Sequence, residues 1–233
     1  MIKNKFIALI PARKGSKGIK NKNLLKIKKL SLVEIAIKNA CSSNRIDEIY
    51  LSSDSKKILE KALKYPKVKT HLRNKKYASD DASSKDVIRD FIKKNYFDRT
   101  KNVILVYLQP SSPFKNAYHL DKAIEVFDKL NKNTLVSCYK PTEDLKEKIF
   151  KSLILLKKKN IRPFYQQKTL HTNRQKLGKV FIPNGAFFIF RITKNFFKTY
   201  INFKSSISYI MKENEAIDIN NKKDYEKAKK LFK

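Results

Sequence analysis

The sequence predicts an α/β domain built on a mostly parallel β-sheet with helices on its faces. Short apolar runs alternate along the chain with segments of helical periodicity. The intervals between runs are long enough for the crossover helices that parallel strands require. Polar and basic loops follow several runs, as expected where ligands bind beyond the carboxyl ends of parallel strands. A chain of 233 residues suits one main domain of this class.

The first strand, helix and intervening loop define the start of this pattern. Residues 5–10, KFIALI, form an apolar run that Pro11 ends, which predicts a buried strand leading into a loop. Residues 32–40 have apolar side chains at helical spacing, and Ser31 is a suitable N-cap. The order is therefore strand, basic loop and helix.

The same alternation continues to about residue 140. Apolar runs predict strands at 48–52, 68–72, 102–108 and 134–137. Helical spacing predicts helices at 58–63, 87–91 and 117–130. The loops at 11–23, 52–54 and 109–114 all follow strands, so we expect them to meet at one edge of the sheet.

The alternation of predicted strands and helices stops between about 140 and 182, where the sequence is polar and rich in lysine. We interpret this segment as an insertion into a single domain spanning residues 1–233, serving as a flap or a dimerisation element. Beyond it, strands are expected at 186–190 and 206–211, and a helix at 224–232.

Composition narrows the possible partners. The net charge of +33 is typical of nucleic-acid-binding proteins, but only eight of the 54 basic residues are arginine, and lysine is spread along the whole chain. This pattern indicates a lysine-rich surface, and we expect no nucleic-acid partner. Cys41 and Cys138 lack metal-ligand spacing, and no apolar run is long enough to span a bilayer. We expect a soluble cytoplasmic protein without a membrane partner.

Residues 11–23, PARKGSKGIKNKN, are the first candidate for binding chemistry. The loop combines five basic residues with Gly15, Ser16 and Gly18. Linked phosphates need converging backbone N–H groups, which glycine permits, and cations that offset their charge. Neither a Walker A motif nor a GxGxxG fingerprint is present. The alternative is an ordinary solvated turn.

Several segments together resemble one known family, the acylneuraminate cytidylyltransferases or CMP-sialic acid synthetases. They occur in the same order over most of the chain: IPARKGSKGIKNKNL (10–24), SSD (52–54), LRNKKYASDDASSKDVI (72–88), LQPSSPF (108–114), NRQ with PNGAFFIF (173–190) and IDI (217–219). The resemblance implies a Rossmann-like nucleotide-diphospho-sugar transferase fold, a homodimer, CTP, Mg²⁺ and a nonulosonic acid as acceptor.

The resemblance also implies roles for individual residues. The nucleotide would be bound by Arg73 and Ser84 at the cytidine and, in the phosphate loop, by Ala12, Arg13, Gly15, Ser16, Lys17, Lys22 and Asn23. The acceptor would be bound by Gln109, Ser111, Ser112, Arg174, Gln175 and Asn184. The catalytic residues would be Arg13, Lys17, Lys22 and Asp218.

Two positions depart from the family pattern. Relatives often have two acids at the late metal site, whereas this chain has Asp218 and Asn220, which predicts weaker Mg²⁺ binding. Lys115 stands where relatives often have arginine, so the charge is kept and the planar fork is lost.

These observations predict a nucleotidyltransferase that couples CTP to a sialic-type nonulosonic acid, giving a CMP-sugar and pyrophosphate. No histidine is needed as a general base, and we expect His71, His119 and His171 to be packing or surface residues. Three alternatives are a Kdo-type cytidylyltransferase, a basic nucleic-acid-binding protein, and a relative that binds nucleotide without catalysis. The Lys17-Gly18-Ile19 sequence argues against the Kdo type, whose loop usually has Arg-Leu-Pro there.

Overall fold

The computed structural model describes residues 4–16, 18–79, 81–95, 102–155, 160–193, 195–198, 200–201 and 205–232. The main sheet contains β1 (Lys5–Pro11), β4 (Glu48–Ser53), β5 (Val68–Leu72), β6 (Val103–Leu108), β7 (Thr134–Tyr139), β10 (Ile182–Arg191) and β11 (Ser206–Met211). The helices around it are α1 (Leu32–Cys41), α2 (Lys56–Leu59), α3 (Ser84–Lys94), α4 (Ala117–Leu130) and α6 (Lys222–Leu231).

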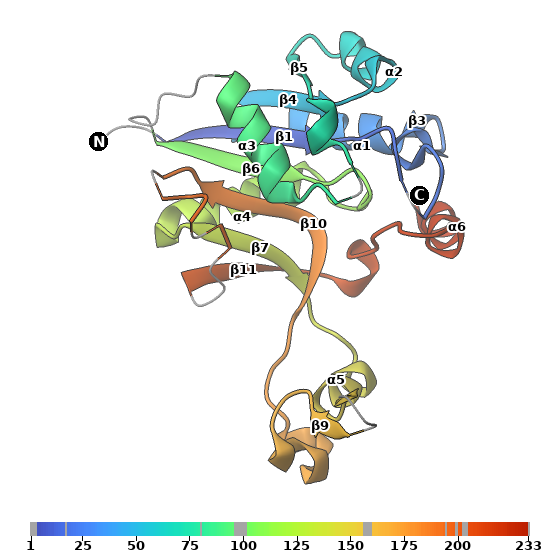
Figure 1. Cartoon of the computed structure of the whole chain (residues 1–233), viewed down its shortest axis with the longest axis vertical. Coiled ribbons are helices and arrows are strands. Elements are labelled where there is room, and N and C mark those ends of the chain that lie inside the picture. Colours follow the sequence, from blue (N-terminus) through green and yellow to red (C-terminus); the bar gives the residue numbers. More distant parts are fainter. Residues whose placement is uncertain are drawn as a thin grey trace.

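The sheet has the strand order β11-β7-β10-β6-β1-β4-β5. β1 is parallel to β4 and β6, β4 to β5, and β7 to β11, whereas β10 is antiparallel to both of its neighbours. The prediction of a mostly parallel sheet flanked by helices is therefore confirmed. Because β1, β4, β5 and β6 share a direction, the loops that follow them meet at one edge (Figure 1).

Helices cover both faces of the sheet. Phe6, Ala8 and Ile10 of β1 pack into a core with α1 and α4, whereas Ile7 and Leu9 pack into a second core with α3. This explains why β1 reads as a continuous apolar run, because alternate side chains are buried on opposite faces. The loop that follows β1 therefore starts from a rigid position.

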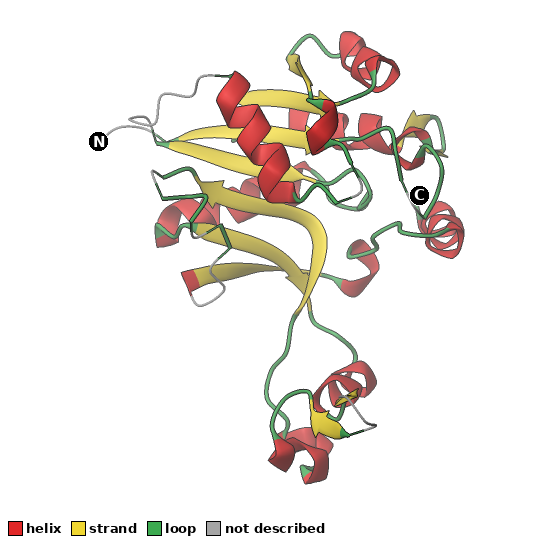
Figure 2. Ribbon diagram, in the orientation of Figure 1, coloured by secondary structure: helices red, strands yellow, loops and turns green. Residues whose placement is uncertain are grey.

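Residues 140–181 leave the sheet after β7 and return to it at β10. Their described residues, 140–155 and 160–181, form a small element that stands away from the rest of the chain, as Figures 1 and 2 show. It contains α5 (Glu143–Phe150), the antiparallel hairpin of β8 (Leu153–Leu155) and β9 (Ile161–Pro163), and the 3-10 turns η5 (Gln167–His171) and η6 (Arg174–Lys176). We call residues 140–181 the projecting element.

Local signals account for where the elements begin and end. α4 matches its predicted bounds because Asn116 accepts from the His119 N–H at 3.1 Å and caps the helix. Ser31 caps α1 through a capping box with Glu34, as expected. The helix predicted at 58–63 is instead the short α2 followed by η2 (Glu60–Lys64).

The sequence did not reveal the short hairpin of β2 (Lys26–Ile27) and β3 (Leu30–Ser31), which precedes α1. Among the described residues, none of the helices is both long enough and apolar enough to cross a bilayer.

Candidate active site

The basic loop folds back over the ends of β1 and β4. The Ala12 N–H donates to the Ser52 carbonyl at 2.8 Å, and the Lys14 N–H donates to Asp54 Oδ1 at 2.8 Å. Asn23 Nδ2 donates to the Arg13 carbonyl at 2.9 Å and joins the two ends of the loop. Lys17 lies outside the described residues. The remainder of the loop is held at the carboxyl edge of the sheet, where it was predicted to lie.

A pocket of about 200 Å³ opens beside this loop. It brings together predicted site residues from five separate stretches of the sequence. Its lining consists of Pro11, Arg13, Lys22, Asn23, Arg73, Ala82, Ser84, Val87, Tyr107, Gln109, Pro110 and Ser111.

Arg13 and Lys22 supply positive charge on the loop side of the pocket. Arg13 Nη1 donates to the Ser79 carbonyl at 2.9 Å. Lys22 Nζ donates to the Ile219 carbonyl at 2.8 Å and lies 3.4 Å from Asn220 Oδ1. Burial lowers the pKa of Lys22 from its ordinary value, although the charge of Asp218 opposes this shift. An anion in the pocket would stabilise the charged form of Lys22.

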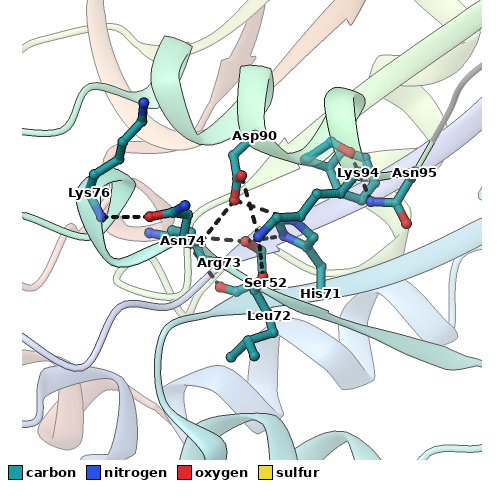
Figure 3. Close-up of polar contacts among 10 residues, drawn as sticks. Ser52, His71, Leu72, Arg73, Asn74, Lys76, Asp90, Lys94 and Asn95 are labelled. Carbon is teal, nitrogen blue, oxygen red and sulfur yellow. Dashed lines mark hydrogen bonds and ion pairs between the residues drawn. The ribbon is translucent and has the colours of Figure 1, made fainter.

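Arg73 supplies a third cation to the lining of the pocket. Its side chain is buried and reaches back over β4, where Nε lies 3.3 Å from Ser52 Oγ and Nη2 donates to the Ser52 carbonyl at 2.9 Å (Figure 3). Burial lowers its pKa, but a guanidinium remains charged in proteins. Arg73 is therefore a fixed donor group beside Ser84 and Tyr107.

The late acidic segment packs against the basic loop. Ile219 is fully buried in a small apolar cluster with Ile27, Leu32 and α6, which turns Asp218 and Asn220 outward together. Asn220 Nδ2 donates to Asp218 Oδ2 at 2.9 Å, and Ser112 Oγ lies 3.5 Å from Asp218 Oδ1. Asn220 thus occupies one carboxylate oxygen and directs its own carbonyl towards Lys22.

The oxygen atoms of Asp218 and Asn220 suit a Mg²⁺ site that a bound ligand completes more than one formed by the protein alone. Oxygen ligands from carboxylate and amide groups are those Mg²⁺ prefers, and it commonly takes the rest from phosphates and water. No cluster of three acidic, histidine or cysteine ligands exists among the residues that the structure describes. Asp218 is the one carboxylate of the predicted pair, so phosphate oxygens would have to complete the coordination.

Gly185 is a site residue that sequence reasoning did not assign. It has φ +68° at an irregular position in β10, and a β-carbon there would lie 3.7 Å from Gln109 Oε1 and 3.9 Å from Asp218 Oδ2. Glycine therefore allows the left-handed backbone conformation at this position, beside Gln109 and Asp218. The signal in the sequence was the glycine that follows Asn184.

Lys115 is a buried cation beneath the loop at 109–114. It is 1% exposed, and its ammonium donates to the carbonyl oxygens of Gln109 at 2.5 Å and Ser112 at 2.8 Å. Burial lowers the pKa of Lys115 to about 7, against the opposing effect of Asp218. The two hydrogen bonds from Lys115 therefore fix the backbone of this loop.

Four residues predicted to bind the acceptor are not part of the pocket lining: Ser112, Asn184, Arg174 and Gln175. Asn184 is buried within the sheet, where Oδ1 accepts from Ser137 Oγ at 2.6 Å and Nδ2 contacts Met211 Sδ at 3.2 Å. Arg174 and Gln175 lie in the projecting element, and Arg174 Nε is 4.0 Å from Glu147 Oε2. One copy of the chain thus does not bring this pair to the pocket.

The site as a whole is suited to an elongated polyanion. Arg13, Lys22 and Arg73 line one pocket, and the charge of Asp218, which could hold a divalent cation, acts on Lys22. Cations fixed in a partly enclosed site can stabilise charge that develops on phosphate oxygens. A phosphorylated ligand with a neutral ring or sugar matches this distribution.

Comparison with known proteins gives consistent results. A family model described as "Cytidylyltransferase" matches residues 7–231. The N-acylneuraminate cytidylyltransferase of Escherichia coli O18:K1:H7 is 30% identical over 97% of this chain, which spans 52% of that protein's length. The pseudaminic acid cytidylyltransferase of Campylobacter jejuni is 30% identical, with 98% of this chain and 97% of that protein covered.

Solved structures agree with the fold. A CMP:2-keto-3-deoxy-manno-octonic acid synthetase complexed with CTP superposes with a TM-score of 0.69 at 14% identity, covering 97% of this chain and 98% of the other. A 4-diphosphocytidyl-2C-methyl-D-erythritol synthase from Anaerococcus prevotii has a TM-score of 0.66, also at 14% identity, with 97% of each chain covered.

Proposed function

Because this chain belongs to the cytidylyltransferase family, we propose that it transfers the cytidylyl group of CTP to a nonulosonic acid, giving a CMP-sugar and pyrophosphate. The observation that carries the proposal is the meeting of Arg13, Lys22 and Arg73 in one pocket. Two relatives that match nearly the whole chain are named for nonulosonic acids, which supports this acceptor class. The proposed use of CTP, an intracellular nucleotide, supports a cytoplasmic location.

In the proposed reaction, the acceptor hydroxyl attacks the α-phosphorus of CTP and the bond to pyrophosphate breaks. Arg13 and Lys22 would lie against the phosphates and offset the charge that grows on the leaving group. Lys17 belongs to the same proposed set. Such reactions depend mainly on positioning, so the fixed loop geometry contributes directly to the rate.

Arg73 and Ser84 are proposed to hold the cytidine. A guanidinium only donates hydrogen bonds, and cytosine offers two adjacent acceptors at O2 and N3. Uracil instead has a donor at N3 that would face the guanidinium, so Arg73 would favour cytosine. Gln109, Ser111 and Ser112 lie on the adjoining strand-end loop, from which they would face the nucleotide sugar and the acceptor.

Asp218 is proposed to hold Mg²⁺, with the carbonyl of Asn220 as a weaker ligand. When bound, Mg²⁺ would neutralise phosphate oxygens and lower the pKa of the attacking hydroxyl. In this chain Asn220 also orients Asp218 through the 2.9 Å hydrogen bond from Nδ2. Metal binding would therefore compete with a contact that is already present.

The projecting element is proposed to bind a second copy of the chain. Leu155 is 72%, Ile161 60%, Phe164 57% and Tyr165 56% exposed, which is unusual for large apolar side chains gathered on one small element. The same element carries Arg174 and Gln175, which do not line the pocket of their own chain. In a homodimer, they would reach the acceptor bound by the partner subunit.

The function is tested by incubating the pure protein with CTP, Mg²⁺ and a panel of sialic, legionaminic and pseudaminic acids. We expect pyrophosphate release with at least one acid and a CMP-sugar of matching mass. Lys22→Ala should lower kcat/KM by about 10²- to 10³-fold, as for other groups that stabilise transition-state charge. Lys57→Ala, on the exposed surface of α2, should leave it unchanged. Absence of pyrophosphate with every acid would refute the proposed reaction.

A further inference from the structure

A buried polar network stands behind Arg73 and has no role in the reaction described above. Ser52 and His71 are direct partners in the register of β4 and β5, and Asp90 of α3 lies above them. All three side chains are buried, with Ser52 0% and the other two 4% exposed. Figure 3 shows that the side chains of Ser52, His71 and Asp90 point towards one another.

Successive contacts connect Asp90 to Arg73, which lines the pocket. Asp90 Oδ2 lies 3.5 Å from His71 Nε2, His71 Nδ1 lies 2.9 Å from Ser52 Oγ, and Ser52 Oγ lies 3.3 Å from Arg73 Nε. Asp90 is itself fixed, because Oδ2 accepts from the Asn74 N–H at 3.1 Å and Oδ1 lies 3.4 Å from Lys94 Nζ. The network therefore begins at α3, where Asp90 is held by Asn74 and Lys94, and ends at Arg73.

Hydrogen-bond chemistry fixes the direction of the two links to Ser52, whereas His71 Nε2 makes no hydrogen bond with any described residue and lies at ion-pair distance from Asp90. Burial lowers the pKa of His71 to about 4, so the ring is neutral near pH 7. A proton on Nε2 faces the Asp90 carboxylate favourably, whereas a lone pair there would be repelled. Nδ1 then accepts from the Ser52 hydroxyl, which leaves an Oγ lone pair for Arg73 Nε–H.

The same residue types occur in hydrolytic triads, but this arrangement differs from one. In a triad, Nε2 faces the serine and Nδ1 faces the aspartate, whereas here the two ring nitrogens are reversed. Ser52 is also inaccessible to a substrate. The hydroxyl thus orients a neighbour and does not act as a nucleophile.

The presence of arginine rather than lysine at position 73 indicates that the orientation of this side chain matters. Only eight of the 54 basic residues in this chain are arginine, so charge alone would be supplied by lysine. A guanidinium differs in its planar, fixed set of donors. Nε and Nη2 are engaged by Ser52, and Arg73 is one of the residues that line the pocket.

We propose that Ser52, His71 and Asp90 are positioning residues that fix the plane of Arg73 and thereby set the selectivity of the pocket for cytosine over uracil. The inference rests on the proposed function, since it assumes that Arg73 contacts the base. It adds residues from β4, β5 and α3 that touch no substrate. A merely structural role would affect stability but not the ratio of CTP to UTP affinity.

The test measures CTP and UTP binding by calorimetry together with thermal melting. Ser52→Ala should lower the CTP to UTP selectivity about ten-fold, the scale of one hydrogen bond to a charged group. Ser53→Ala is the matched control, because Ser53 is in the same strand, is also fully buried, and bonds the Ser55 N–H instead. Its selectivity should remain that of the wild type.

His71 provides a second pair of variants should Ser52→Ala fail to fold. His71→Leu removes the acceptor and should lower selectivity, whereas His71→Asn keeps an acceptor near Nδ1 and should largely restore it. Wild-type selectivity in folded Ser52→Ala and His71→Leu would overturn the inference and leave the proposed function standing. A wild-type protein that binds neither nucleotide would instead refute the proposed function itself.

Discussion

Gly18 of the basic loop lies directly against the backbone of Asn220, and a β-carbon at position 18 would overlap the Asn220 carbonyl oxygen. The two residues are 202 positions apart in the sequence. Their contact joins the phosphate-binding candidate to the segment that carries Asp218. Glycine is thus required by close approach of two backbones.

Gly18→Ala should therefore separate the basic loop from residues 218–220. We expect a loss of about 1–3 kcal/mol in unfolding free energy, the usual cost of overpacking, and a larger loss of activity than of stability. Gly178→Ala is the control, because its β-carbon would meet Phe150 at 3.7 Å, an ordinary contact. Thermal melting and pyrophosphate release measure both effects, and equal behaviour of the two variants would contradict this packing.

Much of the fold was predictable because its signals are local. α4 begins after the capping residue Asn116 and has a regular apolar face, so its bounds followed from the sequence alone. The basic loop was recognisable from its glycines and cations. In contrast, the helix predicted at 58–63 breaks into α2 and η2, a change that spacing did not reveal.

The parts of the site that were missed depend on contacts between distant segments. Burial of Lys115 depends on the loop that folds over it, and Gly185 lies beside Gln109 and Asp218 from loops that are distant in the sequence. Asn184 was expected to contact substrate, yet its amide is occupied by Ser137 and Met211. The roles carried over from the family remain predictions at these positions.

Asn220→Asp should strengthen Mg²⁺ binding. The substitution removes the hydrogen bond to Asp218 and places a second carboxylate beside the first, which a divalent cation would bridge. We expect the Mg²⁺ concentration that half-saturates CTP binding to fall roughly three- to ten-fold. Asn221→Asp makes the same charge change one residue later, where the side chain caps α6 and aspartate is an equally good cap. A similar shift in both variants would indicate a general charge effect.

Lys115 should make stability depend on pH in a defined direction. Its pKa is lowered from 10.5 to about 7 in the folded chain, so the unfolded chain holds this proton more tightly between those values. The unfolding free energy contributed by Lys115 should then rise as pH increases from 7 towards 10.5.

Urea unfolding of wild type and Lys115→Met at pH 7 and pH 9 measures this contribution. The wild type should gain stability relative to the variant at the higher pH. Lys57→Met, at an exposed position of α2, should show no such difference. A constant difference between wild type and Lys115→Met would show that Lys115 titrates normally in the folded state.

The proposed homodimer predicts that two inactive variants can restore each other. Lys22 lies in the pocket of its own chain, whereas Arg174 would serve the partner's pocket from the projecting element. Lys22→Ala and Arg174→Ala should each be nearly inactive alone. When subunits exchange, a mixed dimer holds one pocket with both residues intact and one with neither.

Random exchange of equal amounts should therefore recover about a quarter of wild-type sites, because half of the dimers are mixed and half of their pockets are complete. Lys22→Ala mixed with Lys57→Ala is not a suitable control, since the latter is active alone. A double variant carrying both Lys22→Ala and Arg174→Ala, mixed with Lys22→Ala, should recover nothing because no intact Lys22 is present. Failure of the first mixture, with subunit exchange verified by mass spectrometry, would place Arg174 outside the partner's acceptor site.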